Sequence, residues 1–424
     1  MDLINRTQEC TAEHYPGNAA AGADCTAKLY PGSMPAGVTG HAAEAGGVKE
    51  HYLDNAATTQ VCREAADMCL KLMLEDYGNP SSTHRKGREA AAVLAESRKT
   101  LAAALGADPS EIYFTSCGSE SDNWAIIRGA EYMSRKGRHI ISSTVEHSAV
   151  KKSLELLEKQ GFEVTLLNPD STGKITAQAV KAALRPDTVL VTLMMVNNET
   201  GAVNDIAGIA KMLAREAPAA LLHTDAVQAF MKVPFKAKTL GAHMISISGH
   251  KIHAPKGIGA LYIKKGINLK PLFVGGGQEG GLRAGTESLP LIGAFAVAAD
   301  IARKGMTKNI ELMRAFKTDI ATRLKEFIPE LVVLDTEAPH ILLVALPGFR
   351  SEVLMNFLEE RGVYVSKSSA CKRGARSYVL EAAGMDSRAI DGAVRIGLSR
   401  MTTAEDVDAL VEGLKEAHEK LAHR

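Results

Sequence analysis

The stretch Met244-Ile-Ser-Ile-Ser-Gly-His-Lys251 indicates both the fold and the kind of site that we expect in this chain. It opens as an apolar run with alternation, which is typical of a buried strand, and it breaks at Ser248. A strand that ends in small polar residues and one amine is suited to hold a carbonyl compound covalently. In such a site Ser248 and His250 bind an anion and Lys251 is the anchor. The same pattern is also typical of a surface lysine after a core strand, so its interpretation depends on the rest of the chain.

Short apolar segments alternate with helical patterns on both sides of this stretch. The rhythm predicts βαβ units and a mostly parallel sheet covered by helices on both faces. Ligands of such sheets bind beyond the carboxyl ends of the strands, so polar residues that follow each strand are the candidates for a site. The expected strands are 112–115, 139–142, 164–167, 189–196, 221–224, 244–248 and 260–263.

The pattern changes near residue 300. Long helical segments near 301–327 precede expected strands at 341–346, 363–366 and 394–398, and a last helix runs from 404 to the end. We therefore predict an α/β protein in which a large domain is followed by a smaller α+β domain. The expected parts are a poorly ordered extension (1–50), an entry segment that packs with the small domain (51–65), the large domain (66–300) and the small domain (301–424).

Composition limits the classes of function. The chain has 50 Lys and Arg residues against 49 Asp and Glu residues, so its net charge of +1 does not favour nucleic acid or an anionic membrane surface as a partner. No apolar run approaches the roughly 18 residues that a membrane span requires. The six cysteines are scattered without a C-x-x-C pair, which is typical of free thiols in a reducing cytoplasm.

Polar residues follow the expected strands in a regular succession. Gly118 and Ser119 come after the first strand, at a turn into a helix, where backbone N–H groups and a hydroxyl favour a phosphate. His147 follows the second strand and can stack on a flat heterocycle. Asn198 follows the strand that ends near Val196, and its amide can bind a carboxylate or a phenolic oxygen.

Asp225 follows the next strand, with Gln228 three residues on, and Lys251 closes the series. A carboxylate at this place can keep a pyridinium nitrogen protonated, and an amide can reach a ring oxygen. Each residue alone has an ordinary explanation, such as a helix cap, a turn or a surface position. Together the five strand ends predict a pocket for pyridoxal 5′-phosphate.

Two competing motifs lack their context. Gly275 to Gly280 fits G-x-G-x-x-G, but Asp300 falls in an alanine-rich helical run and not at the end of a second strand, as a dinucleotide site requires. His250, His253 and Asp225 suit a metal poorly because Lys251 lies among them, so we expect no metal.

Ten motifs occur in order over the chain: YLDNAATT, YGNPSSTH, YFTSCGSESDN, EHSAV, VNNETG, HTDAVQ, SISGHKIHAPKGIGALYI, GGGQEGGLRAGT, SSAC and VRIGLSR. In these motifs the chain from about residue 52 to about residue 414 resembles the NifS/IscS-type cysteine desulfurases. Those are pyridoxal-phosphate enzymes of aminotransferase class V and fold type I. The resemblance implies removal of sulfur from L-cysteine in the cytoplasm by a homodimer, and delivery of that sulfur to an acceptor protein for iron–sulfur cluster or thio-cofactor synthesis.

The resemblance also implies roles for single residues. Lys251 would hold the cofactor covalently, His147 would stack on its ring, Asp225 would pair with the ring nitrogen, and Cys371 would carry the sulfur as a persulfide. Lys367, Lys372 and Arg373 would favour the Cys371 thiolate. The other implied ligands are Gln228 for the ring hydroxyl, Asn198 for cofactor and substrate, Arg395 for the substrate carboxylate, and Gly118, Ser119, Ser248, His250 and the partner subunit's Thr286 for the phosphate.

Two stretches depart from the pattern of these desulfurases. Cys117-Gly118-Ser119 stands where they often have Gly-Ala-Thr, and basic residues follow Cys371. A selenocysteine lyase or another enzyme of the same fold, such as an aminotransferase, is an alternative. An inactive paralogue that serves as a scaffold is a third possibility, against which the intact Lys251, Asp225 and His147 argue.

Overall fold

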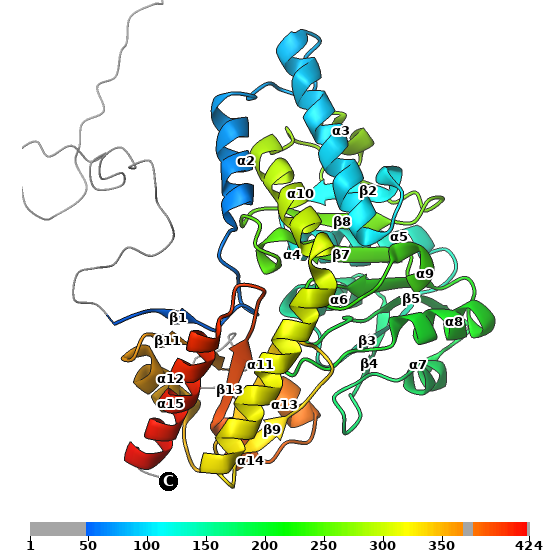
Figure 1. Ribbon diagram of the computed structural model, residues 1–424. Helices are drawn as coiled ribbons and strands as arrows, with labels where there is room; N and C mark the ends of the chain where they lie inside the picture. Colours follow the sequence, from blue (N-terminus) through cyan, green and yellow to red (C-terminus); the bar gives the residue numbers. More distant parts are fainter. Residues whose placement is uncertain (1–47, 368–375, 422–424) are drawn as a thin grey trace, which may run out of the picture. The chain divides into compact units, whose positions relative to one another are not determined.

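The structure is a computed structural model that describes residues 48–367 and 376–421, and the elements below belong to the unit Glu50–Arg424 (Figure 1). The strands are β1 His51–Tyr52, β2 Ile112–Thr115, β3 His139–Ser143, β4 Glu163–Leu167, β5 Thr188–Thr192, β6 Leu221–Asp225, β7 Met244–Ser248, β8 Gly259–Ile263, β9 Val332–Leu334, β10 Ile341–Ala345, β11 Val363–Tyr364, β12 Ser366–Lys367 and β13 Ala393–Gly397. The α-helices are α2 Arg63–Leu74, α3 Arg85–Leu105, α4 Gly118–Asn123, α5 Gly129–Met133, α6 Ser148–Lys159, α7 Ala177–Ala183, α8 Ile206–Glu216, α9 Ala237–Leu240, α10 Leu289–Lys304, α11 Met306–Phe327, α12 Ser351–Glu359, α13 Tyr378–Ala382, α14 Ser387–Asp391 and α15 Ala404–Lys420.

The larger sheet has seven strands in the order β2-β8-β7-β6-β5-β3-β4. Strands β4, β3, β5, β6 and β7 pair in parallel, and β8 runs antiparallel to both β7 and β2. The crossovers between the parallel strands are helical, as βαβ units require. The prediction of an α/β fold with a mostly parallel sheet is confirmed.

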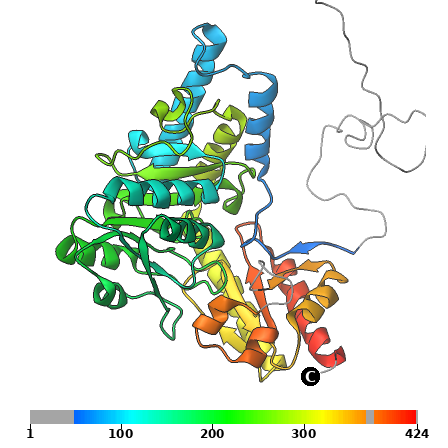
Figure 2. The same cartoon turned by 180° about the vertical axis from the view of Figure 1, so that it is seen from behind.

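Both faces of this sheet are buried because alternate side chains of each strand enter different apolar clusters. Ile245 and Ile247 of β7 pack in a cluster with residues of α3, α8 and α10. Met244 packs on the other face, in a cluster with Trp124 and with Leu154 of α6. Figures 1 and 2 show the helices that cover these two faces. All five residues of MISIS are buried, and its two serines are small enough to pack on the same face as Met244.

A second, smaller sheet has the order β12-β13-β10-β9 and is antiparallel throughout. The helices α11, α12 and α15 contribute Ile320, Leu354 and Leu410 to a separate apolar cluster with this sheet. Strand β1 pairs in parallel with β11 beside it.

One close backbone approach brings the start of the described chain to the second sheet. The backbone N of Ala56 would lie 2.5 Å from a Cβ atom on Gly397, and the N of Asn55 would lie 2.8 Å from it. Only glycine leaves room for this crossing. Asn55 N and Nδ2 both donate to Gly397 O, at 3.2 and 2.9 Å, so the segment is fixed across the end of β13.

Three expected elements differ from the structure in detail. Strand β5 ends at Thr192 and not at 196, because the Met194 amide donates to Glu146 Oε2 over 2.9 Å instead of to β3. The expected helix near 301–327 belongs to two helices, α10 and α11, which meet at Gly305. The expected strand 363–366 is two short strands, since β11 pairs with β1 and β12 with β13.

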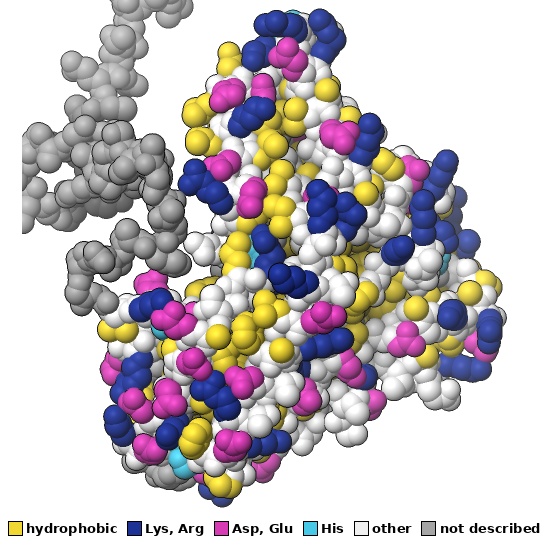
Figure 3. All heavy atoms as spheres, in the orientation of Figure 1, with side chains coloured by type: hydrophobic (Ala, Val, Ile, Leu, Met, Phe, Trp, Pro, Cys, Tyr) yellow, Lys and Arg dark blue, Asp and Glu magenta, His cyan; other side chains and the backbone are white. Residues whose placement is uncertain are grey.

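No helix in the two described ranges is long and apolar enough to cross a membrane. The face seen in Figure 3 carries basic and acidic side chains in mixture, without a large area of one sign.

Candidate active site

A cavity of about 380 Å³ lies beyond the carboxyl ends of β6 and β7. Ten of the twelve residues expected in the site line it, and the other two are Thr286 and Cys371. The ten are Gly118, Ser119, His147, Asn198, Asp225, Gln228, Ser248, His250, Lys251 and Arg395. The strand ends therefore meet in one place, as the parallel sheet requires.

Lys251 ends the short 3-10 turn that follows β7. Its Nζ donates to Ala56 O and to Ala57 O, each over 2.7 Å. Burial and the nearby Arg395 guanidinium lower the pKa of Lys251 to about 8. With a pKa of about 8 the amine is neutral in about a tenth of the molecules at pH 7, and the neutral form is the one that a nucleophile or a general base requires.

Asp225 ends β6 and lines the cavity. Its Oδ1 accepts the amide of Val227 over 2.9 Å. Burial raises the pKa of Asp225, and it raises the pKa of the neighbouring Asp122 well above its usual value. A protonated heterocyclic nitrogen in the cavity would favour the charged form of Asp225, so this acid fits a pyridinium group.

One end of the cavity has hydrogen-bond donors suited to an anion. The buried Ser248 Oγ has no hydrogen-bond partner among the described residues. Burial and the adjacent Lys251 lower the pKa of His250 to about 3, so its imidazole is neutral. Gly118 begins α4, and a Cβ atom there would lie 2.7 Å from Val227 Cγ2, so the turn is closely packed and needs a glycine. These features fit a phosphate group.

His147 and Gln228 also line the cavity. His147 caps α6, since its Nδ1 accepts the Ala149 amide over 3.2 Å. Gln228 Nε2 donates to Ala56 O over 2.8 Å, and its Oε1 lies 3.2 Å from His340 Nε2. Burial keeps the pKa of His340 well below its usual value, so a neutral His340 donates this hydrogen bond.

The opposite end of the cavity presents a guanidinium from β13. Arg395 is 5% exposed, and it donates to Asn198 O over 2.8 Å and to Asp54 Oδ1 over 3.0 Å. Its buried Nε has no hydrogen-bond partner among the described residues. Arginine binds carboxylates in a forked geometry, so this end of the cavity fits the carboxylate of an amino acid.

One expected residue, Thr286, lies elsewhere, and the position of another, Cys371, is not described. Thr286 is exposed and lines a different hollow of about 120 Å³, together with Phe114 and Ser116. Cys371 lies outside the described residues, as do Lys372 and Arg373. Lys367, at the end of β12, pairs with Glu352 Oε1 over 3.2 Å.

Sequence reasoning missed several residues of the site. Asp54, Ala56 and Ala57 hold Arg395 and Lys251, two of them through backbone carbonyls that leave no side-chain signal. The motif YLDNAATT marked this stretch without assigning it a role. Asp122, Glu199 and Tyr378 also line the cavity.

Comparison with known proteins agrees with this geometry. The family model described as aminotransferase class-V matches residues 51–410. "Cysteine desulfurase 2" of Trichormus variabilis is 41% identical over 375 residues, which cover 87% of this chain and 93% of that protein. "Cysteine desulfurase IscS" of Methanosarcina thermophila is 39% identical over 379 residues, with 88% and 93% covered. A solved structure titled "NIFS-LIKE PROTEIN" superposes with a TM-score of 0.83 at 34% identity, and covers 88% of this chain and 100% of its own.

Proposed function

The chain belongs to the class-V aminotransferase family, and from this premise we propose that it is a cysteine desulfurase. Such an enzyme removes the sulfur of L-cysteine, releases L-alanine and carries the sulfur as a persulfide for iron–sulfur cluster or thio-cofactor synthesis. The observation that carries the proposal is the single cavity in which a low-pKa lysine, a buried acid and a buried arginine meet. The relatives at about 40% identity over most of the chain bear the name of this activity.

The cofactor that fits the cavity is pyridoxal 5′-phosphate. We propose that Lys251 binds it covalently, that Gly118, Ser119, Ser248 and His250 hold its phosphate, and that Asp225 pairs with its ring nitrogen. His147 would stack on the ring, and Gln228 and Asn198 would bind its ring hydroxyl side. The unpartnered Ser248 hydroxyl and the buried Asp225 support this assignment. When bound, the cofactor supplies an electron sink for bonds broken next to the substrate α-carbon.

The residues of this chain then have distinct tasks. Arg395 binds the substrate carboxylate, since one of its buried nitrogens is free of partners among the described residues. Lys251 takes the proton from the substrate α-carbon and returns a proton to the product, because a pKa of about 8 leaves it able to do both near neutral pH. Asp225 keeps the ring nitrogen protonated.

Cys371 is proposed as the sulfur acceptor. Its thiolate attacks the substrate sulfur, a new S–S bond forms and the substrate C–S bond breaks. The electron pair of the C–S bond stays on carbon, which takes a proton, so L-cysteine and the Cys371 thiol become L-alanine and the Cys371 persulfide. Substrate carbon is reduced and its sulfur is oxidised, and no external oxidant is needed.

An assay of alanine formation tests the proposal. The purified holoenzyme is supplied with L-cysteine or, separately, with L-selenocysteine, and alanine and the released chalcogen are measured. We expect equal amounts of alanine and persulfide sulfur from L-cysteine. Alanine from selenocysteine alone would replace the proposal with a selenocysteine lyase, and no alanine from either would favour another activity of the family.

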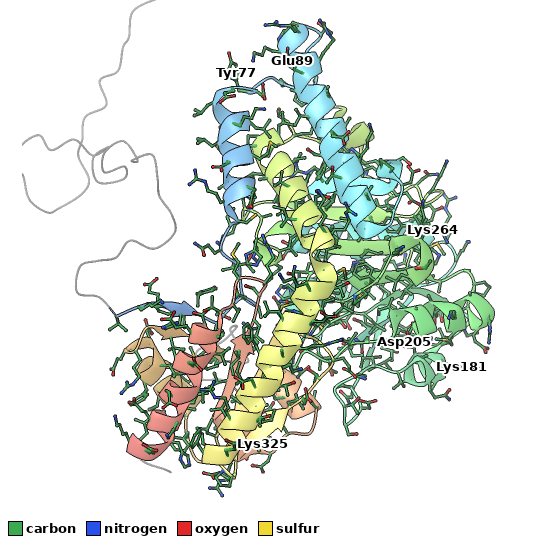
Figure 4. The ribbon with its side chains drawn as sticks, viewed as in Figure 1. Tyr77, Glu89, Lys181, Asp205, Lys264 and Lys325 are labelled. Atoms are coloured by element: carbon green, nitrogen blue, oxygen red, sulfur yellow. The ribbon has the colours of Figure 1, made fainter. Side chains whose placement is uncertain are left out.

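We further propose a cytoplasmic homodimer in which the smaller sheet belongs to a separate domain. Thr286 is exposed and lies outside its own chain's cavity, which supports a role in the cavity of a second copy. Exposed apolar side chains of α2, Leu70 and Leu74, and of Tyr77 in the loop after it are suited to an interface (Tyr77 is labelled in Figure 4). A sulfur-acceptor protein would be the other partner.

A further inference from the structure

The carboxylate of Glu199 contacts the chain shortly after Cys371. Ser377 Oγ donates to Glu199 Oε2 over 2.5 Å, although the two residues are 178 positions apart. Glu199 is 6% exposed and Ser377 is 2% exposed, so water does not compete for this bond. Ser377 lies six residues beyond Cys371 in the sequence, and Glu199 directly follows Asn198. The bond therefore joins the end of the cavity near Asn198 to a residue that is close in sequence to the proposed sulfur acceptor.

The Ser377 hydroxyl takes part in two hydrogen bonds. It accepts the amide of Leu380 over 3.2 Å, which makes Ser377 the N-cap of α13, and it donates its own proton to Glu199. A chain of N–H to O–H to carboxylate bonds is mutually strengthening in a buried place. The start of α13 is thereby fixed relative to Glu199.

Glu199 is itself held firmly by its own turn. Asn197 Oδ1 accepts the amides of Glu199 and Thr200, each over 2.9 Å. The carbonyl of Asn198 accepts Arg395 Nη1 over 2.8 Å. The turn cannot shift without breaking these bonds. The position of Glu199 is therefore fixed, and its bond to Ser377 fixes the start of α13.

Tyr378 provides a second link beside the first. Its hydroxyl donates to Glu146 O over 3.0 Å, and Lys151 Nζ lies 3.7 Å from the centre of its ring. Tyr378 also lines the cavity. Ser377, the N-cap of α13, and Tyr378, its first residue, thus contact the loops and helix that follow β3 and β5.

Burying an ionisable side chain such as Glu199 is energetically unfavourable if its role is only to link two elements. Burial raises its pKa to about 7, against the hydrogen bond from Ser377 and the charges of Arg395 and Lys151. A neutral side chain would connect the same elements without the cost of burying an ionisable group. Such groups in clefts are often functional.

We propose that Glu199 and Ser377 are positioning residues for sulfur transfer. Their hydrogen bond, with Tyr378 beside it, holds the start of α13, which follows Cys371 by six residues in the sequence, at the cavity. This role rests on the proposed function, because it acts on the step in which the Cys371 thiolate meets the substrate sulfur. Substrate binding itself does not depend on it.

Single-turnover kinetics of the holoenzyme test the proposal. Cysteine binding is followed by the absorbance change of the cofactor, and sulfur transfer by alanine formed in one turnover. We expect Glu199→Ala and Ser377→Ala each to slow alanine formation by about 10²-fold, the loss that a misplaced reacting group causes. The cysteine concentration for half-maximal absorbance change should move by less than about threefold, and Glu199→Gln should recover most of the loss because its amide oxygen also accepts from Ser377.

A matched control removes a surface contact of Arg376, the residue directly before Ser377. Arg376 pairs with Asp391 over 2.7 Å, but both side chains are largely exposed, at 48% and 41%. Arg376→Ala should therefore leave the rate of alanine formation within about twofold of the parent. The Glu199→Ala, Ser377→Ala double variant should be no slower than either single variant, since both remove one shared bond.

Hydrogen exchange gives a readout that does not depend on activity. The amide of Leu380 donates to Ser377 Oγ, so α13 should exchange faster in Ser377→Ala and in Glu199→Ala but not in Arg376→Ala. The proposal is overturned if the two variants weaken cysteine binding without slowing alanine formation, if their effects add, or if Arg376→Ala is equally slow. A parent enzyme that makes no alanine from cysteine would instead refute the proposed function.

Discussion

Single residues in the cavity carry polar atoms that folding alone does not satisfy. Ser248 Oγ, Asp122 Oδ1 and Arg395 Nε are buried without a hydrogen-bond partner among the described residues. Each such atom costs about 1–3 kcal/mol of folding free energy. Three of them around one cavity support the proposal of a ligand that supplies the missing partners, since native proteins rarely leave buried polar groups unpaired.

Lys251 should react fastest above neutral pH in the cofactor-free protein. Only its neutral form attacks a carbonyl carbon, and with a pKa of about 8, against the usual 10.5, the neutral fraction at pH 7 is raised roughly 300-fold. The rate of borohydride-reducible attachment of pyridoxal phosphate should rise with pH, reach half its maximum near pH 8 and level off above that pH. A rate that keeps rising tenfold per pH unit toward 10.5 would contradict the lowered pKa.

Asp225→Asn should separate cofactor binding from turnover. The amide fills the same space but cannot hold a ring nitrogen protonated, so we expect bound cofactor with alanine formation reduced at least about 10²-fold. Absorbance of the purified variant measures the first quantity and alanine release at saturating cysteine the second. Parent-like turnover would refute the role of Asp225.

Elements that combine a clear period with end signals were predictable from the sequence. The apolar run 244–248 became β7, and Gly106 ends α3 in a left-handed conformation as a helix stop should. The predicted strand β5 was too long. The strand ends where the Glu146 side chain accepts the Met194 amide, and strand propensity cannot reveal a contact between residues so far apart in the sequence. Strand β1 has two residues and exists only through its pairing with β11.

The candidate site was predictable to the extent that it lies at strand ends. Side chains such as Asp225 and Lys251 follow apolar runs and are therefore visible in the sequence. The carbonyls of Ala56 and Ala57, which accept from Lys251, have no side-chain signature. The pairing of Glu199 with a serine 178 positions away depends on tertiary structure alone.

Gly397→Ala should displace the segment 55–57, which passes close to Gly397 of β13 and whose carbonyls accept hydrogen bonds from Lys251. The added Cβ atom would lie 2.5 Å from Ala56 N, so the backbone must move, at a cost of about 1–3 kcal/mol in unfolding free energy. Gly277→Ala is the matched control, because Gly277 has a φ of −82° and no atom lies within 4 Å of the added Cβ. Denaturant unfolding measures both variants, and equal stabilities would contradict the steric argument.

At the scale of the whole chain, the site depends on both sheets. Arg395 comes from β13 of the smaller sheet. Asp225 ends β6 of the larger sheet, and Lys251 follows β7. The segment 54–57 bonds to both Arg395 and Lys251. The cavity is therefore complete only when the two sheets are held together.

The proposed dimer extends this dependence to a second copy. Thr286 lies outside the cavity of its own chain. Thr286→Ala should nevertheless weaken cofactor affinity by about tenfold, which is the equivalent of one hydrogen bond to a charged group. Ser288→Ala is the control, since Ser288 lines the same hollow and is given no role. Sedimentation should show two chains per particle, and an active monomer would exclude the shared site.

The mass of the peptide that carries Cys371 tests the central claim most directly. After the holoenzyme meets L-cysteine without reductant, this peptide should gain the mass of one sulfur atom and lose it on treatment with dithiothreitol. Cys371→Ser should still bind cysteine at the cofactor but should release no alanine at a useful rate, because only the acceptor thiol is missing. Sulfur found on Cys117 or another cysteine, or normal alanine release by Cys371→Ser, would contradict the account.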